Sequence, residues 1–218
     1  MTRIALVHAL AHSVAPINEA LAAAWPEAVR MNLLDDSLSA DLARHAGRGA
    51  GGLDEVMHQR FEALAAYAEG TGADAILFTC SAFGPCIEAA AARRPHMPVL
   101  KPNEAMVADA VALGGRIGLI ASFAPTLTSM PPEFPSGADL VTRLADGALD
   151  ALNRGDGDRH DALVLGAARQ LRDQGAEVIA LAQFSMARAG GRVEHELGIP
   201  VLTTPGSAVR ALRRRLSA

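Results

Sequence analysis

The sequence has few aromatic residues, few cysteines and no strong excess of either charge. Aromatic side chains make up 4% of the 218 residues, so aliphatic side chains must fill the interior, which favours close packing of helices on a sheet. The two cysteines, Cys80 and Cys86, lie too close in sequence to form a disulfide framework. We therefore expect free thiols and a cytoplasmic location.

Other absences exclude further functional classes. The net charge is −4, whereas a nucleic-acid-binding domain is usually basic. No apolar run approaches the ~18 residues that span a bilayer, and the chain enters an apolar strand directly after Arg3, so we expect no signal peptide and no membrane partner. The glycines at 114–118 precede an apolar run, so the dinucleotide fingerprint is absent. We expect no cofactor.

Short apolar runs alternate with longer helical patterns along the chain. Continuous apolar runs indicate strands that are buried on both faces, as in a parallel sheet. The clear strand candidates are 3–8, 74–79, 98–101, 116–122, 177–182 and 199–203, and weaker ones are 28–32 and 138–142. Helical patterns cover 53–69, a stretch capped by Asn103, a stretch that starts at Asp161, and one that starts at Thr204. This alternation predicts an α/β fold with right-handed crossovers.

The two halves of the chain resemble each other. Residues 72–86 and 175–189 both read as small residues, an acidic residue, an apolar run and a small polar turn. We therefore expect two pseudo-symmetric lobes with a cleft between them. Residues 45–53 and 145–160 are rich in glycine or polar residues, which predicts exposed loops or lids.

Ligands of open α/β sheets bind beyond the carboxyl ends of the strands. The residues at these places carry many hydroxyl groups, one thiol and almost no acids, which favours an anionic ligand over Mg²⁺ or Ca²⁺. They are His8 to Ser13, Thr79 to Ser81, Ser122 to Thr126, Gln183 to Met186, and Thr203 with Thr204.

Cys80 is the residue for which the sequence gives the strongest indication of a function. It follows a buried strand, and Gly84-Pro85 then starts a helix, so the free N–H groups after Cys80 lie near its thiol. Such a setting lowers a cysteine pKa, and the same N–H groups bind carboxylates. The competing interpretation is an inert buried cysteine, which is also our interpretation of Cys86.

Two further groups have weaker signals. His8 and His12 have the spacing of a helical metal pair, but they follow a strand and lack a third ligand, so we expect no metal and a substrate contact instead. Asp35, with Ser37 and Ser39 after it, reads as a turn and a helix cap.

Four segments together carry a resemblance to a known family. They are FTCSAFGP at 78–85, PVLKPNEAM at 98–106, IGLIASFAPT at 117–126 and VIALAQFSMA at 178–187. Their order and spacing resemble the aspartate/glutamate/hydantoin racemase superfamily, which includes arylmalonate decarboxylase and maleate isomerases. The resemblance implies two flavodoxin-like α/β lobes with mainly parallel sheets and an active-site cleft between them. It implies a first lobe of 1–100 plus 203–218 and a second lobe of 101–202.

The resemblance also implies a chemistry. Racemases of this family place one cysteine after a strand in each lobe, and the two thiols exchange a proton on opposite faces of the substrate without a cofactor. Cys80 matches the first-lobe cysteine, and Ser122 and Thr126 match hydroxyls that bind the substrate carboxylate. Further contacts with a small carboxylate or hydantoin are expected from His8, His12, Ser13, Ser81, Ala82 and Phe184. The family is often dimeric, so a homodimer or higher homo-oligomer is expected.

The second lobe departs from the two-cysteine pattern. Gln183 occupies the position of the second cysteine, and an amide does not exchange protons near neutral pH; Ser185 nearby is a poor acid without a base. The first hypothesis is a racemase-like enzyme that works through Cys80, with Gln183 and Ser185 in the site and His12, Ser185 or water serving the other face. The alternatives are an arylmalonate-type decarboxylase, a maleate-type cis–trans isomerase, and a silent carboxylate-binding protein.

Overall fold

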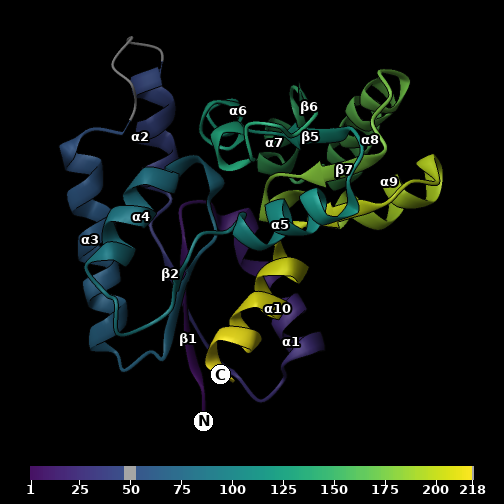
Figure 1. Ribbon diagram of the computed structural model, residues 1–218. Helices are drawn as coiled ribbons and strands as arrows, with labels where there is room; N and C mark the ends of the chain where they lie inside the picture. The colour runs from purple at the N-terminus through teal and green to yellow at the C-terminus, as the bar shows by residue number, and fades with distance from the viewer. Residues whose placement is uncertain (47–52, 218) are drawn as a thin grey trace.

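The computed structural model describes residues 1–46 and 53–217, which form two four-stranded sheets (Figure 1). The first sheet has the order β2-β1-β3-β4 and contains β1 (Arg3–His8), β2 (Val29–Leu34), β3 (Ala75–Phe78) and β4 (Val99–Leu100). The second has the order β6-β5-β7-β8 and contains β5 (Ile117–Ala121), β6 (Leu140–Leu144), β7 (Val178–Leu181) and β8 (Val201–Thr203). All pairs are parallel. The equivalent order confirms the α/β fold and the pseudo-symmetric pair, which we call the first and the second lobe.

Helices connect the strands and cover both sheets. The α-helices are α1 (Val14–Ala24), α2 (Ser37–Ala46), α3 (Glu55–Gly70), α4 (Gly84–Ala92), α5 (Glu104–Leu113), α6 (Thr126–Ser129), α7 (Ala148–Asn153), α8 (Gly157–Asp173), α9 (Gly190–Leu197) and α10 (Thr204–Leu216). The 3₁₀ helices of the described residues are η1 (Ala11–Ser13), η2 (Ser81–Phe83), η3 (Pro131–Glu133) and η4 (Phe184–Ala189). No helix within the described residues combines the length and apolar character that a bilayer crossing requires.

The C-terminal helix, α10, packs against the first lobe. After β8, α10 returns and packs beside α1 (Figure 1). Val209 and Leu212 of α10 join Ile4 and Leu6 of β1 in one apolar cluster. The central strand therefore buries one face under α1 and α10, which explains its continuous apolar run.

The opposite face of the first sheet is packed by aromatic side chains. The ring of Phe61 in α3 lies 5.3 Å from that of Phe78 in β3 and 4.9 Å from that of Phe83 in η2, measured between centroids. All three rings are fully buried, and truncation of such a residue to alanine costs about 3–5 kcal/mol. This packing fixes the turn that follows β3, where Cys80 lies.

Two local predictions for the second lobe were wrong. The helix predicted to start at Asp161 starts at Gly157, and the side chain of Asp156 caps it by accepting a hydrogen bond from the backbone N–H of Arg159. The predicted loop at 145–160 contains α7. Its polar residues lie on the outer face of a helix whose small residues Ala148 and Ala151 are buried, and such a short amphipathic stretch resembles a loop in composition. Residues 47–52 of the other predicted loop lie outside the described part of the chain.

Candidate active site

Cys80 lies two residues beyond the end of β3, in extended backbone that leads into η2. Its sulfur is hydrogen-bonded by the backbone N–H of Ala82 and by the side chain of Ser39. Cys80 as a residue is partly exposed, whereas its thiol group is buried. The expected donor after the strand is therefore present, and α4 begins at Gly84 with proline in its first turn, as predicted.

The expectation of a lowered thiol pKa is wrong for this conformation. Burial raises the pKa of Cys80 to about 11, although the hydrogen bonds from Ala82 and Ser39 act in the opposite direction. Loss of hydration disfavours the thiolate, and two donors do not compensate for it. Cys80 is therefore a protonated acid at neutral pH. Burial likewise raises the pKa of Cys86 to about 12, and Cys86 lies in the apolar core of the first lobe.

Ser39 is a site residue that the sequence reading assigned to a turn and helix cap. Its hydroxyl donates to the backbone carbonyl of Ala9 over 2.7 Å. A hydroxyl carries one proton, so Ser39 donates to the sulfur only when it turns away from Ala9, and its hydrogen bond to Cys80 acts to lower the pKa of the thiol. No local signal marks Ser39, because α2 brings it to Cys80 only through tertiary packing.

His8 contacts Thr79, the residue before Cys80, and both of its ring nitrogens have protein partners. Its Nδ1 lies 2.8 Å from the hydroxyl of Thr79, and its Nε2 lies 2.9 Å from Oδ1 of Asn32. Because Oδ1 of Asn32 only accepts, the network assigns the proton to Nε2. Burial lowers the pKa of His8, which keeps the ring neutral. With both ring nitrogens bound by protein groups, a substrate contact at His8 stays a prediction.

Polar contacts join the two lobes near Cys80. The hydroxyls of Ser81 and Thr126 lie 3.3 Å apart, and both side chains are buried. Ser129 donates to the backbone carbonyl of Ser81 over 3.0 Å. A further contact between the lobes joins Nε2 of His12 to Oδ1 of Asn153 in α7, which lie 3.1 Å apart. Of the sequence candidates, Ser81, Thr126 and His12 therefore meet the opposite lobe, and Ser129 and Asn153 are additional contacts that the sequence reading missed.

The second lobe presents Gln183 two residues beyond the end of β7. Oε1 of Gln183 accepts hydrogen bonds from the backbone N–H of Ser122 at 2.5 Å and from the Ser122 hydroxyl at 3.1 Å. The hydroxyl of Ser185 is buried and has no partner among the described residues.

The remaining sequence candidates are buried at the same junction. Ser13 and Ala82 are both almost fully buried. Phe184 is fully buried in the apolar cluster of Ile17 and Val209, so it packs from η4 into the first lobe. These residues thus shape the junction between the lobes.

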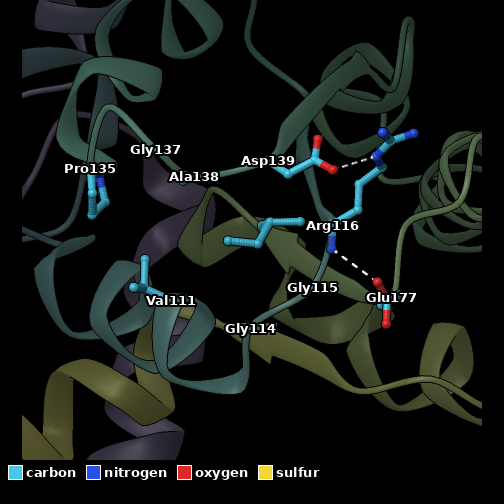
Figure 2. Close-up of a pocket in the computed structure, with 10 residues that line it drawn as sticks. Val111, Gly114, Gly115, Arg116, Pro135, Gly137, Ala138, Asp139 and Glu177 are labelled. Carbon is cyan, nitrogen blue, oxygen red and sulfur yellow. Dashed lines mark hydrogen bonds and ion pairs between the residues drawn. The ribbon is translucent and has the colours of Figure 1, made fainter.

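A cavity of the second lobe lies away from Cys80 and Gln183. The cavity has a volume of about 450 Å³, and its lining includes Gly115, Arg116, Asp139 and Glu177 (Figure 2). These residues precede β5, β6 and β7, so the cavity lies at the amino ends of the strands, opposite to Cys80 and Gln183. Arg116 spans it through an ion pair of 2.9 Å with Asp139. Within the described part of the chain, no three His, Cys, Asp or Glu side chains gather closely enough to hold a metal ion.

Solved structures of racemases share this two-lobe arrangement. A glutamate racemase isoform from Bacillus anthracis has a TM-score of 0.78 at 13% identity, covering 99% of this chain and 82% of that one. Allantoin racemase from Klebsiella pneumoniae has a TM-score of 0.66 at 16% identity, covering 100% and 88%. A liganded arylmalonate decarboxylase variant, with one glycine changed to cysteine and one cysteine to serine, has a TM-score of 0.65 at 18% identity, covering 98% and 92%.

At these identities the structures show a shared fold, and the sequence comparison shows the family. No curated protein matches the chain in sequence. The Asp/Glu/hydantoin racemase family profile matches residues 11–212, which is nearly the whole chain and includes both strand ends that carry Cys80 and Gln183. The chain therefore belongs to the Asp/Glu/hydantoin racemase family.

Proposed function

We propose that this protein transfers a proton at the carbon next to a carboxylate, or next to the carbonyl of a hydantoin, in a small substrate, and that Cys80 is the acid and base. The observation that carries the proposal is the position of Cys80. Its thiol follows β3 at the junction of the lobes and is held between Ala82 and Ser39. Membership of a racemase family supports an isomerase.

The junction offers hydrogen-bond donors for a substrate carboxylate. The hydroxyls of Ser81 and Thr126 face each other across the lobes, so a carboxylate oxygen that enters between them accepts from both. Neutral donors that stabilise developing charge are usually the largest contribution to such chemistry. The α-proton beside a carboxylate is very weakly acidic, so the negative charge must be held on oxygen when the C–H bond breaks.

The proposed step balances without a cofactor. The Cys80 thiol first loses its proton to water, and the thiolate then takes the α-proton. The C–H electron pair moves onto the carboxylate oxygens, and the resulting carbanion regains a proton from Cys80 or from the opposite face. Because the pKa of Cys80 is about 11, only about one molecule in a thousand holds the thiolate at pH 8, which limits the rate of proton removal.

The same raised pKa favours a second candidate, decarboxylation of a malonate-type substrate. In that reaction a C–C bond breaks to release CO₂, the electron pair moves onto the remaining carboxylate, and the resting thiol supplies a proton to the carbon. A protonated thiol is the form needed at the start, and one thiol is sufficient. Likeness in fold to an arylmalonate decarboxylase variant supports this candidate.

Proton NMR in deuterium oxide tests both candidates. The substrate panel contains both enantiomers of aspartate and glutamate, 5-substituted hydantoins and arylmalonates. Cys80→Ala is compared with the wild type, and Cys86→Ala is the matched control because Cys86 lies in the core. We expect loss of an α-proton signal, or deuterium in a decarboxylated product, in the wild type and in Cys86→Ala only.

The outcomes separate the candidates. Exchange at the α-carbon supports the racemase-type reaction, and release of CO₂ supports the decarboxylase. Exchange that persists in Cys80→Ala would contradict the role of Cys80. If no compound shows exchange or loses CO₂, but one of them binds tightly, the result would favour a carboxylate-binding protein.

A further inference from the structure

The side-chain amide of Gln183 has one defined orientation. The backbone N–H of Ser122 is a donor and can only face an acceptor, so the atom of Gln183 next to it is the carbonyl oxygen. The Ser122 hydroxyl donates to the same oxygen over 3.1 Å. The opposite orientation would place the amide NH₂ against the backbone N–H, so this contact fixes the direction of the amide. The hydroxyl, which can donate or accept, adds a second contact to it.

The nitrogen of this amide is left with two unused donors. It makes no hydrogen bond to the described residues, and it is not among their buried polar atoms that lack a partner. The side chain is 8% exposed, so the nitrogen keeps contact with solvent. Two N–H groups are therefore available to a ligand.

Gln183 is the structural counterpart of Cys80. Each residue lies two positions beyond the end of the third strand of its lobe, β3 or β7, and each precedes a 3₁₀ helix that leads into an α-helix beginning with glycine. The 3₁₀ helix after Gln183, η4, contacts η1 and α1 of the first lobe. The nitrogen thus lies at the strand end that faces the junction of the lobes.

We infer that the Gln183 amide donates hydrogen bonds to an anionic oxygen of a carboxylate substrate and exchanges no proton with it. This inference rests on the proposed function. When Cys80 takes the α-proton, the charge that moves onto oxygen is stabilised by the Gln183 N–H groups. The deuteron that Cys80 collects from solvent then returns to the same face. The chemical result is exchange with retention, and the recognised substrate class carries a carboxylate or enolate oxygen toward the second lobe.

Binding is tested first, because it requires no turnover. In ¹⁵N-labelled protein, the side-chain NH₂ signals of Gln183 are identified by their loss in Gln183→Leu. The probes are phenylmalonate, L-glutamate and 5-methylhydantoin. We expect a saturable shift of these signals with at least one carboxylate probe, in the wild type and in the Cys80→Ala variant. No shift with any probe would overturn the inference, whatever the activity of Cys80.

Catalysis is tested with two variants. Gln183→Leu removes both donors and is expected to lower the α-exchange rate about 10²-fold to 10³-fold. In Gln183→Glu, Ser122 still donates to one oxygen and the other repels the substrate when ionised. We expect the exchange rate of this variant, divided by that of the wild type at the same pH, to recover as the pH falls and the carboxyl gains a proton to donate. Gln170→Leu, an exposed change on α8, is the control.

Different experimental results would contradict the inference and the proposed function. If the wild type shows no Cys80-dependent exchange but the Gln183 signals shift saturably, the proton-transfer proposal is contradicted. The carboxylate contact of Gln183 is then still supported. If exchange depends on Cys80 but its rate is unchanged in Gln183→Leu, the role of Gln183 is contradicted. The role of Cys80 is then still supported. Inversion of configuration by the wild type would contradict the expected retention, because a proton would then reach the opposite face from His12, Ser185 or water.

Discussion

The hydroxyl of Ser81, which follows β3 in the first lobe, lies 3.3 Å from the hydroxyl of Thr126 at the start of α6 in the second lobe. Both side chains are buried. A buried polar contact of this kind contributes about 1 kcal/mol and is costly to leave half made. It places two hydroxyl donors from different lobes at the one position that the proposed substrate carboxylate would occupy.

Replacing Thr126 with valine tests this contact. Thr126→Val keeps the shape of the side chain and removes the hydroxyl, so we expect the free energy of unfolding to fall by about 1 kcal/mol and kcat/KM to fall about tenfold or more. Thr128→Val on the exposed side of the same helix should change neither. Denaturant unfolding and the α-exchange assay measure the two effects. An unchanged kcat/KM would remove Thr126 from the substrate site.

The raised pKa of Cys80 predicts a loss of stability at high pH. The folded pKa is about 11 and that of an unfolded thiol is about 8.5. Below pH 8.5 both states hold the proton, so the stabilisation is fully present, and it is lost as the pH rises toward 11. We expect the free energy of unfolding of the wild type to fall by about 3 kcal/mol relative to Cys80→Ala over this window. Parallel curves for the two proteins would show that the thiol is unperturbed.

Ser39 is expected to act on Cys80 without touching substrate. Ser39→Ala removes the hydroxyl that turns to the sulfur when the thiolate forms, so the pKa of Cys80 should rise further. Alkylation of Cys80 by iodoacetamide at fixed pH should slow by about threefold to tenfold. Ser37→Ala, an exposed change on the same helix, is the control. Faster alkylation of Ser39→Ala would mean that the hydroxyl shields the sulfur from solvent.

A second thiol at the Gln183 position should alter the stereochemical outcome. Gln183→Cys places a thiol after the third strand of each lobe, the arrangement that the family's two-cysteine racemases use. We expect exchange with inversion to appear in this variant and to be absent in Gln183→Ser, which has a similar size but no thiol. Chiral chromatography of the recovered substrate measures inversion. Exchange that continues with full retention in Gln183→Cys would show that the two strand ends do not face one substrate carbon.

The buried ring of His8 predicts a loss of stability in acid. Burial lowers the pKa of His8 below the value of 6.5 for an exposed ring, so the unfolded state binds the proton more tightly. The stabilisation is present above pH 6.5 and is lost as the pH falls toward the folded pKa. His8→Gln should therefore flatten part of the decline of unfolding free energy as the pH falls below 6.5. His195→Gln, an exposed change, should leave the decline intact.

Much of the fold follows from local sequence patterns. Continuous apolar runs predicted the four central strands β1, β3, β5 and β7, because a strand covered on both faces has no polar side to show. The helix start at Gly84-Pro85 followed from the fixed φ of proline. The start of α8 was misplaced because Asp156 and Asp161 are equally good caps by residue type, and only packing decides which N–H groups need an acceptor.

The sequence by itself determined the α/β class, the pairing of two similar lobes, and the position of Cys80 and Gln183 at equivalent strand ends, since these depend on periodicity and order along the chain. Only the tertiary structure decided the chemistry of these positions. The thiol is protonated because distant segments bury it, Ser39 reaches it from a helix 41 positions earlier in the chain, and His8 is engaged by Thr79 and Asn32. Desolvation and hydrogen-bond direction depend on which groups meet in space, and that information is not local in sequence.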